Sequence, residues 1–85
     1  MKPNLKLRDQ IFEIIKNQMK INDPPETTLT YNRLMKERFT KFQTMQMIGQ
    51  CIAVELFEVM KLKKPDDESR YVKNLKLLRQ WDSNN

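Results

Sequence analysis

Hydrophobic residues recur along the chain at the three- and four-residue spacing of amphipathic α-helices. Between residues 5 and 20, apolar side chains fall on one half of a helix projected at about 100° per residue, and charged or amide side chains fall on the other. Gln18 also projects into the apolar half, so its amide needs a hydrogen-bond partner if it is buried. The residues expected to face inward are Leu7, Ile11, Phe12, Ile14, Ile15 and Met19.

Helix-start signals predict a second helix over residues 24 to 37. Asp23 precedes two prolines, and Glu26 follows Asp23 by three positions. A proline in the first turn is tolerated because its missing N–H has no partner there in any case. We therefore expect the Asp23 side chain to cap this helix. The side chains expected to be buried are Thr28, Tyr31, Leu34 and Met35.

The third predicted helix covers residues 41 to 62 and is the longest. Thr40 precedes it, and Gln43 completes a capping box three positions later. Arg38 stands where helices commonly end on a left-handed glycine, so either the turn avoids positive φ or Arg38 accepts about 1 kcal/mol of strain. The expected core face consists of Phe42, Met45, Ile48, Ile52, Leu56 and Val59.

Gly49, the only glycine of the chain, lies within this core face. Glycine in a helix interior lowers stability by about 1 kcal/mol relative to alanine. Its presence at this position therefore indicates that another helix approaches closely.

The opposite face of the third helix changes from polar to apolar along its length. Gln43, Gln46 and Gln50 occupy its first half, and Val54 and Phe57 its second half. An apolar patch of this kind is covered either by the fourth helix or by a second chain, and we favour a symmetric dimer. The candidate partner surface consists of Met47, Gln50, Val54 and Phe57.

A fourth helix is predicted over residues 67 to 81, after Pro65 and a run of three acidic residues. Leu77 or Trp81 would cover Val54 and Phe57 if the patch is closed within one chain. The four segments together predict a single all-α domain over residues 1 to 85, an antiparallel four-helix bundle with a long central third helix. In the fourth helix we expect inward-facing Tyr71, Val72, Leu75, Leu78 and Trp81.

Composition excludes several kinds of chemistry. The 85 residues include one glycine and no histidine, so glycine-rich phosphate loops, Ser-His-Asp triads and the histidine-containing metal sites of helical bundles are ruled out. Cys51 has no histidine to activate it and is expected to be a small buried apolar residue. We therefore expect no enzymatic activity, no metal and no cofactor.

Glu55 and Glu58 are two carboxylates set one turn apart among apolar residues of the third helix. Such a pair would suit acid–base chemistry or a metal ion, but unpaired carboxylates are rarely buried and nothing indicates a substrate cleft. We expect Glu55 at the core edge, hydrogen-bonded to a neighbouring helix, and Glu58 in solvent.

Two functions are compatible with these features, and we favour a non-enzymatic module that binds another protein or itself. The net charge of +5 permits anionic partners. The single cysteine cannot form an internal disulfide, and the longest apolar run is shorter than the ~20 residues of a membrane span. We therefore expect a cytoplasmic protein without a membrane segment.

The alternative function is that of a helix-turn-helix protein that binds nucleic acid through its second and third helices. Arg33, Lys36 and Arg38 would contact phosphates. We consider nucleic acid the less favoured partner because the recognition helix would be unusually long and would carry Phe42 near the groove. The side chains that would approach the bases are Lys41, Gln43 and Gln46.

Three segments of the chain read NQMKINDPPET, YNRLMKERFT and MIGQCIAVELFEVMK. Together they resemble a family of small bacterial proteins of unknown function, and the likeness runs from about residue 17 to residue 75. The resemblance implies a helical fold and no activity. Relatives often carry glycine at the position of Arg38, and histidines at those of Phe12, Phe42 and Gln46, so a metal site built on those histidines is absent here. The matching positions are Asn17, Gln18, Asp23, Pro24, Pro25, Glu26, Arg33, Leu34, Ile48, Gly49 and Glu55.

Overall fold

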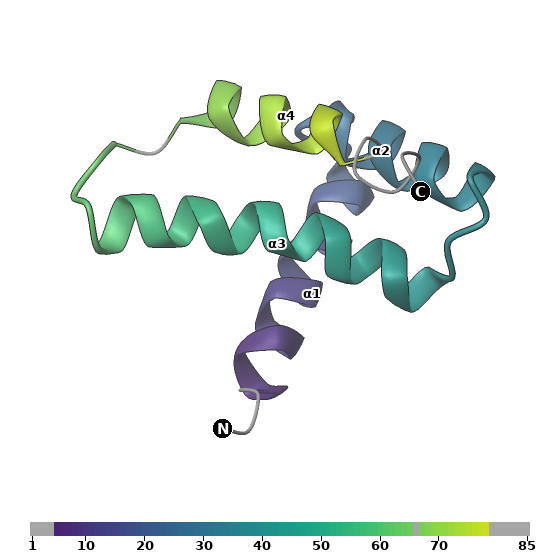
Figure 1. The fold of residues 1–85 in the computed structure, drawn as a ribbon, viewed down its shortest axis with the longest axis horizontal. Coiled ribbons are helices and arrows are strands. Elements are labelled where there is room, and N and C mark those ends of the chain that lie inside the picture. The colour runs from purple at the N-terminus through teal and green to yellow at the C-terminus, as the bar shows by residue number, and fades with distance from the viewer. Residues whose placement is uncertain (1–4, 66, 79–85) are drawn as a thin grey trace.

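Four helices make up most of the chain in the computed structural model, which describes residues 5–65 and 67–78 (Figure 1). They are α1 (Leu5–Ile21), α2 (Pro25–Lys36), α3 (Lys41–Met60) and α4 (Glu68–Leu77). The predicted all-α helical bundle is confirmed, and the first three helices begin and end within two residues of the predicted bounds. Trp81, expected in the fourth helix, lies outside the described residues.

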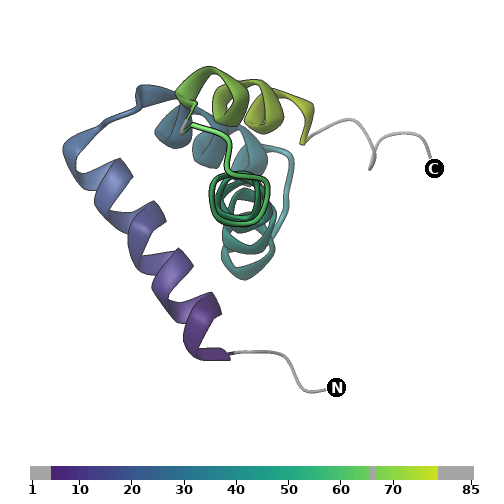
Figure 2. The same cartoon turned by 90° about the vertical axis from the view of Figure 1, so that its left-hand side faces the viewer.

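The long helix α3 lies at the centre and packs against each of the other three helices. In Figure 1, α4 runs back over α3 in the opposite direction, whereas α1 crosses α3 steeply. Figure 2 shows α3 end-on, with α2 and α4 over one side of it and α1 over another. Helix α2 also packs against each of the other three helices. Among the described residues, the backbones of α1 and α4 do not come into contact.

Each helix contributes one fully buried large aliphatic residue to the centre of the core. These are Ile15, Leu34, Ile48 and Leu75. Burying such a side chain stabilises the fold by about 1.5–3 kcal/mol. The four helices therefore share a single core.

Gly49 lies where α1 crosses α3. A Cβ atom placed on Gly49 would lie 3.2 Å from Cγ2 of Ile11 and 3.9 Å from Cδ1 of Ile15. The first of these distances is shorter than normal van der Waals contact, so a Cβ atom here would require the Ile11 side chain to move by a few tenths of an ångström. The expectation that Gly49 permits a close helix approach is confirmed.

A cluster of three side-chain oxygens ties α1, α2 and α4 together on the far side of this crossing. Gln18 Oε1 accepts hydrogen bonds from the Thr27 hydroxyl at 2.7 Å and from the Tyr71 hydroxyl at 3.0 Å, and the two hydroxyl oxygens are also 3.0 Å apart. The hydrogen-bond partner predicted for Gln18 is therefore present. It links α1 to α4, two helices whose backbones do not meet.

The predicted start of α2 is wrong by one position, and its predicted inward face is right for Leu34 and Tyr31 and wrong for Thr28 and Met35. Pro24, not Asp23, is the N-cap, and no side chain caps the helix. Thr27 is buried while Thr28 is only half-buried, and Met35 is exposed. The reason is the oxygen cluster, which places the Thr27 hydroxyl against Gln18 and Tyr71. Hydrophobicity does not distinguish two adjacent threonines. The buried residues of α2 are Thr27, Thr30 and Leu34.

The predicted core face of α3 is correct in its middle and wrong at its two ends. Phe42 is 48% exposed, and Val59 is also exposed. Because α1 crosses α3 steeply, it covers only the middle turns, and the same geometry leaves Leu7 and Ile14 of α1 exposed. The buried residues of α3 are Thr44, Met45, Met47, Ile48, Gly49, Cys51, Ile52 and Glu55.

The predicted capping box at the start of α3 is confirmed. The Gln43 backbone N–H donates to Thr40 Oγ1 at 3.0 Å, and the Thr40 N–H donates to Gln43 Oε1 at 2.9 Å, which completes the capping box. Asp67 accepts from two N–H groups at the start of α4. Arg38 takes the left-handed conformation with φ of 76°. Asn22 and Lys63, just beyond α1 and α3, also have positive φ.

We expect Gly49→Leu to lower the free energy of unfolding by about 1–3 kcal/mol, the usual effect of overpacking. Leucine is a better helix former than glycine, so any loss must come from crowding against Ile11. Urea denaturation measures the change. Gln50→Leu, one residue away and exposed, serves as the control and should shift stability by less than about 0.5 kcal/mol. Equal stability of the two variants would contradict the close crossing.

We expect Arg38→Gly to raise the free energy of unfolding by about 0.5–1 kcal/mol, because glycine adopts positive φ without the strain of a side chain. Arg38→Ala retains a Cβ atom and should give no such gain. Both are measured by urea denaturation. If Arg38→Gly is less stable than the wild type, the Arg38 side chain makes a stabilising contact.

Candidate functional site

Glu55 is engaged in an ion pair between α3 and α4. Arg70 Nε donates to Glu55 Oε2 at 2.7 Å, and Arg70 Nη2 donates to Glu55 Oε1 at 3.0 Å. The hydrogen bond to Glu55 raises the pKa of the Arg70 guanidinium. Bidentate pairs of this kind are strong and directional. Glu55 thus lies at the core edge with a partner on a neighbouring helix, as predicted, and fastens α4 to α3.

Glu58 differs from the prediction that it lies in solvent. Its side chain is 21% exposed, and its Oε1 lies 3.2 Å from Nζ of Lys64 in the segment after α3. The Lys64 backbone N–H also donates to the Glu58 carbonyl at 3.1 Å, which holds Lys64 alongside the last turns of α3. Glu55 and Glu58 therefore pair with different cations.

Cys51 is buried, as predicted for a small apolar residue. Burial raises the pKa of its thiol to about 11. The nucleophilic form of cysteine is the thiolate, so Cys51 is unreactive near neutral pH. Across residues 5–65 and 67–78, no three side chains of the types His, Cys, Asp and Glu gather as a metal site.

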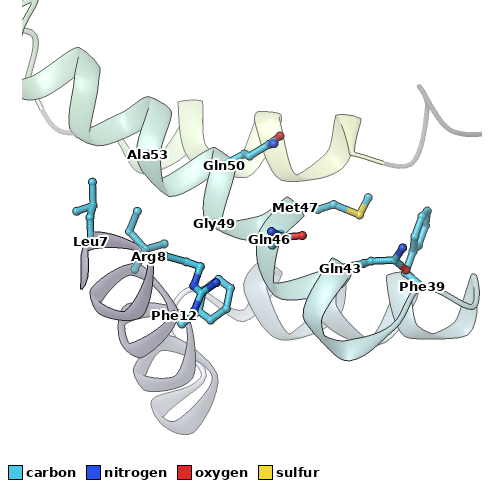
Figure 3. Close-up of a pocket in the computed structure, with 11 residues that line it drawn as sticks. Leu7, Arg8, Phe12, Phe39, Gln43, Gln46, Met47, Gly49, Gln50 and Ala53 are labelled. Atoms are coloured by element: carbon cyan, nitrogen blue, oxygen red, sulfur yellow. The ribbon is translucent and has the colours of Figure 1, made fainter. Parts of the chain in front are cut away.

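A groove of about 550 Å³ opens between the first half of α1 and one face of α3 (Figure 3). Its volume is within the range of ligand-binding pockets. In Figure 3, Leu7, Arg8 and Phe12 of α1 lie opposite the glutamines of α3. The apolar lining residues are Leu7, Ile11, Phe12, Phe39, Met47, Gly49 and Ala53. The polar lining residues are Arg8, Gln43, Gln46 and Gln50.

Arg8 is held on the wall of this groove by two aromatic rings. Its guanidinium carbon lies 5.7 Å from the ring centroid of Phe12 and 5.4 Å from that of Phe42. The two rings meet edge to face, with their centroids 6.0 Å apart. Cation–π contacts at these distances contribute about 0.5–1 kcal/mol at exposed sites. Phe42 therefore packs against the guanidinium at the groove and not in the core.

Three of the four residues of the candidate partner surface are exposed, as a binding surface requires, and the surface itself stays a prediction. Val54 is 44% and Phe57 53% exposed, and Gln50 is also exposed. Met47 is wrong as a surface residue, because it is 7% exposed and belongs to the core cluster beneath the groove. Leu77, proposed to cover the patch, is itself exposed.

The candidate nucleic-acid residues divide into engaged and exposed groups. Arg33 donates to the Leu75 carbonyl at 3.1 Å and pairs with Glu37, so this side chain, expected to contact phosphates, is engaged in supporting α4. The Gln43 amide belongs to the capping box. Lys36, Arg38 and Lys41 are exposed, and Gln46 lines the groove.

Sequence reasoning missed Arg8 and Phe39 as residues of the groove. Neither belongs to a recognisable motif, and Arg8 reads as an ordinary solvated residue of an amphipathic helix. The one useful signal was Gly49, which indicated a close helix approach without saying which helix approaches or at what angle.

Comparison with models of protein families, with curated proteins and with solved structures finds no match. Within the described part of the chain, no helix has the length and apolar character needed to cross a membrane. The function must therefore be argued from the groove and the exposed face of α3.

We expect stability to fall as the pH rises from about 9 to about 12. Burial raises the pKa of the Tyr71 hydroxyl from 10.0 to about 12 and that of the Cys51 thiol from 9.0 to about 11. Their contribution to stability is therefore complete below pH 9 and is lost as the unfolded chain ionises first. Urea denaturation between pH 8 and pH 12 measures it.

Tyr71→Phe and Cys51→Ala are the matched controls for this pH dependence. Tyr71→Phe should flatten the curve between pH 10 and pH 12, and Cys51→Ala between pH 9 and pH 11. A wild-type stability that stays constant over the whole range would show that neither group is shielded from water.

Proposed function

We propose that this protein is a non-enzymatic interaction module that binds another protein, or a second copy of itself, through the exposed face of α3 and the adjoining part of α1. The observation that carries the proposal is an apolar strip formed by Val54, Phe57 and Met60. All three are exposed, and their spacing places them side by side on the helix. Single exposed apolar residues are common, but contiguous ones mark binding surfaces.

The apolar strip continues into the groove. Ala53 precedes Val54 and lies at the end of the groove near Leu7 (Figure 3). Gln50 joins the two regions, because it lines the groove and stands one turn before Val54. An apolar patch beside a concave surface with a few amide groups has the character of a protein-binding surface.

The groove lining also supports binding over catalysis. Among the lining residues that the structure describes, Arg8 is the only one with a charged side chain, and none is a histidine, aspartate, glutamate, lysine or cysteine. General acid–base catalysis needs a group that titrates near the working pH. Cysteine is a residue type that can act as a nucleophile, but Cys51 is buried, and burial raises the pKa of its thiol to about 11.

Light scattering on the purified protein and on Phe57→Lys tests the proposal. A charge at position 57 should remove binding while leaving the fold intact, because Phe57 is 53% exposed. Leu29→Lys is the matched control, since Leu29 is an exposed apolar residue on α2. In a self-associating protein we expect the wild type and Leu29→Lys to be dimers and Phe57→Lys a folded monomer.

If the wild type is a monomer, chemical cross-linking in cell extract is the second arm. We then expect a discrete cross-linked protein with the wild type and with Leu29→Lys, and none with Phe57→Lys. The proposal would be contradicted if the protein forms no dimer and also gives no cross-link that is sensitive to Phe57→Lys. Loss of folding in Phe57→Lys would assign Phe57 to the core and would also contradict it.

A further inference from the structure

We propose that the groove between α1 and α3 receives an acidic, partly apolar peptide segment of a partner protein, and that Arg8 pairs with a carboxylate of that segment. This inference rests on the proposed function, which it extends by naming the chemistry of the partner. It depends on Arg8 and the groove, whereas the proposed function depends on the apolar strip.

The first observation is that a buried donor of Arg8 has no acceptor. Within the part of the chain that the structure describes, the buried Arg8 Nε atom has no hydrogen-bond partner. The Arg8 side chain makes a long hydrogen bond, 3.4 Å from Nη2 to the exposed carboxylate of the adjacent Asp9. Leaving a buried donor unsatisfied is unfavourable by about 1–3 kcal/mol. A ligand reaches Nε only if the guanidinium shifts to expose it, and an acceptor placed there then recovers that energy.

The second observation is the contrast with two other arginines. Arg70 binds the Glu55 carboxylate through Nε and Nη2, and Arg33 donates to the Leu75 carbonyl and pairs with Glu37. Both are satisfied within the chain. In Arg70 the Nε atom binds a carboxylate, whereas in Arg8, a residue of the groove lining, the Nε atom is buried and has no acceptor among the described residues.

The third observation is that the guanidinium of Arg8 is already oriented. Contacts with the rings of Phe12 and Phe42 hold it on the groove wall, as Figure 3 shows for Phe12. An arginine that is pre-organised in this way loses less conformational freedom when it binds a carboxylate in two-pronged fashion.

The rest of the lining indicates a peptide. Most lining residues are apolar, and Gln46 and Gln50 place exposed amides along the α3 side, where they can donate to and accept from a peptide backbone. A nucleic acid would require several cations to neutralise its phosphates, and the described residues of the groove lining supply one, Arg8. The net charge of +5 further favours the approach of an acidic segment.

The experiment begins with selection of peptides from a displayed random library on the immobilised wild-type protein. We expect the enriched sequences to combine aspartate or glutamate with large apolar residues. One enriched peptide is then synthesised, together with versions in which each acidic residue is replaced by its amide. Calorimetry measures their binding to the wild type, to Arg8→Met and to Lys16→Met.

We expect Arg8→Met to weaken binding about tenfold or more, the usual effect of losing a hydrogen-bonded charge pair. One amide replacement in the peptide should weaken binding to the wild type equally and should have little further effect on Arg8→Met. Lys16→Met removes the same charge from an exposed position of α1 outside the groove lining and should bind like the wild type. Methionine retains the apolar stem, and circular dichroism verifies folding.

Three results would overturn the inference: no enriched peptide, enriched peptides without acidic residues, or equal binding by the wild type and Arg8→Met. The amide-substituted peptides are tested on the wild type. Their binding therefore still tests the need for a peptide carboxylate if Arg8→Met does not fold. Binding that is lost in Phe57→Lys but unchanged in Arg8→Met would leave the proposed function intact and remove only the acidic partner.

Discussion

The contact between α1 and α3 at Gly49 is the constraint on which the rest of the arrangement depends. With only a hydrogen on Gly49, Ile11 of α1 comes within 3.2 Å of the point where a Cβ would stand, and Ile15 is fully buried. The helices cross steeply there (Figure 1), so they diverge on either side of the contact. On one side the divergence opens the groove. On the other, α1 carries Gln18 to Thr27 and Tyr71.

The short helix α4 is held in place both by apolar burial and by polar contacts with the other helices. An isolated helix of ten residues is unstable in water, so α4 depends on its neighbours. Leu75 enters the core, Arg70 binds Glu55 of α3, and Tyr71 reaches Gln18 of α1. Arg33 of α2 donates a hydrogen bond to the carbonyl of Leu75, near the C-terminal end of α4. Each of the other three helices therefore holds α4 through a polar contact.

Local signals in the sequence were sufficient to predict the helices. They were not sufficient for features that depend on how the helices pack against one another. The capping box at Thr40 and the need of Glu55 for a partner on another helix follow from residue chemistry alone, although the sequence did not identify that partner as Arg70. The choice of Thr27 over Thr28 depends on two distant side chains, and the exposure of Phe42 depends on the crossing angle of α1. The groove itself was not predictable for the same reason, since periodicity defines the face of each helix and not the angle between two helices.

The buried position of Cys51 allows the opening of the core to be measured through the reactivity of its thiol. The only thiol of the sequence lies buried on the central helix, where an alkylating reagent in solution has no access to it. Modification at neutral pH requires that a neighbouring helix lift away from α3 first. The rate of alkylation under native conditions thus reports how often the core opens, by the same logic that links amide hydrogen exchange to local unfolding. A ligand bound across α1 and α3 would slow that reaction without touching the cysteine.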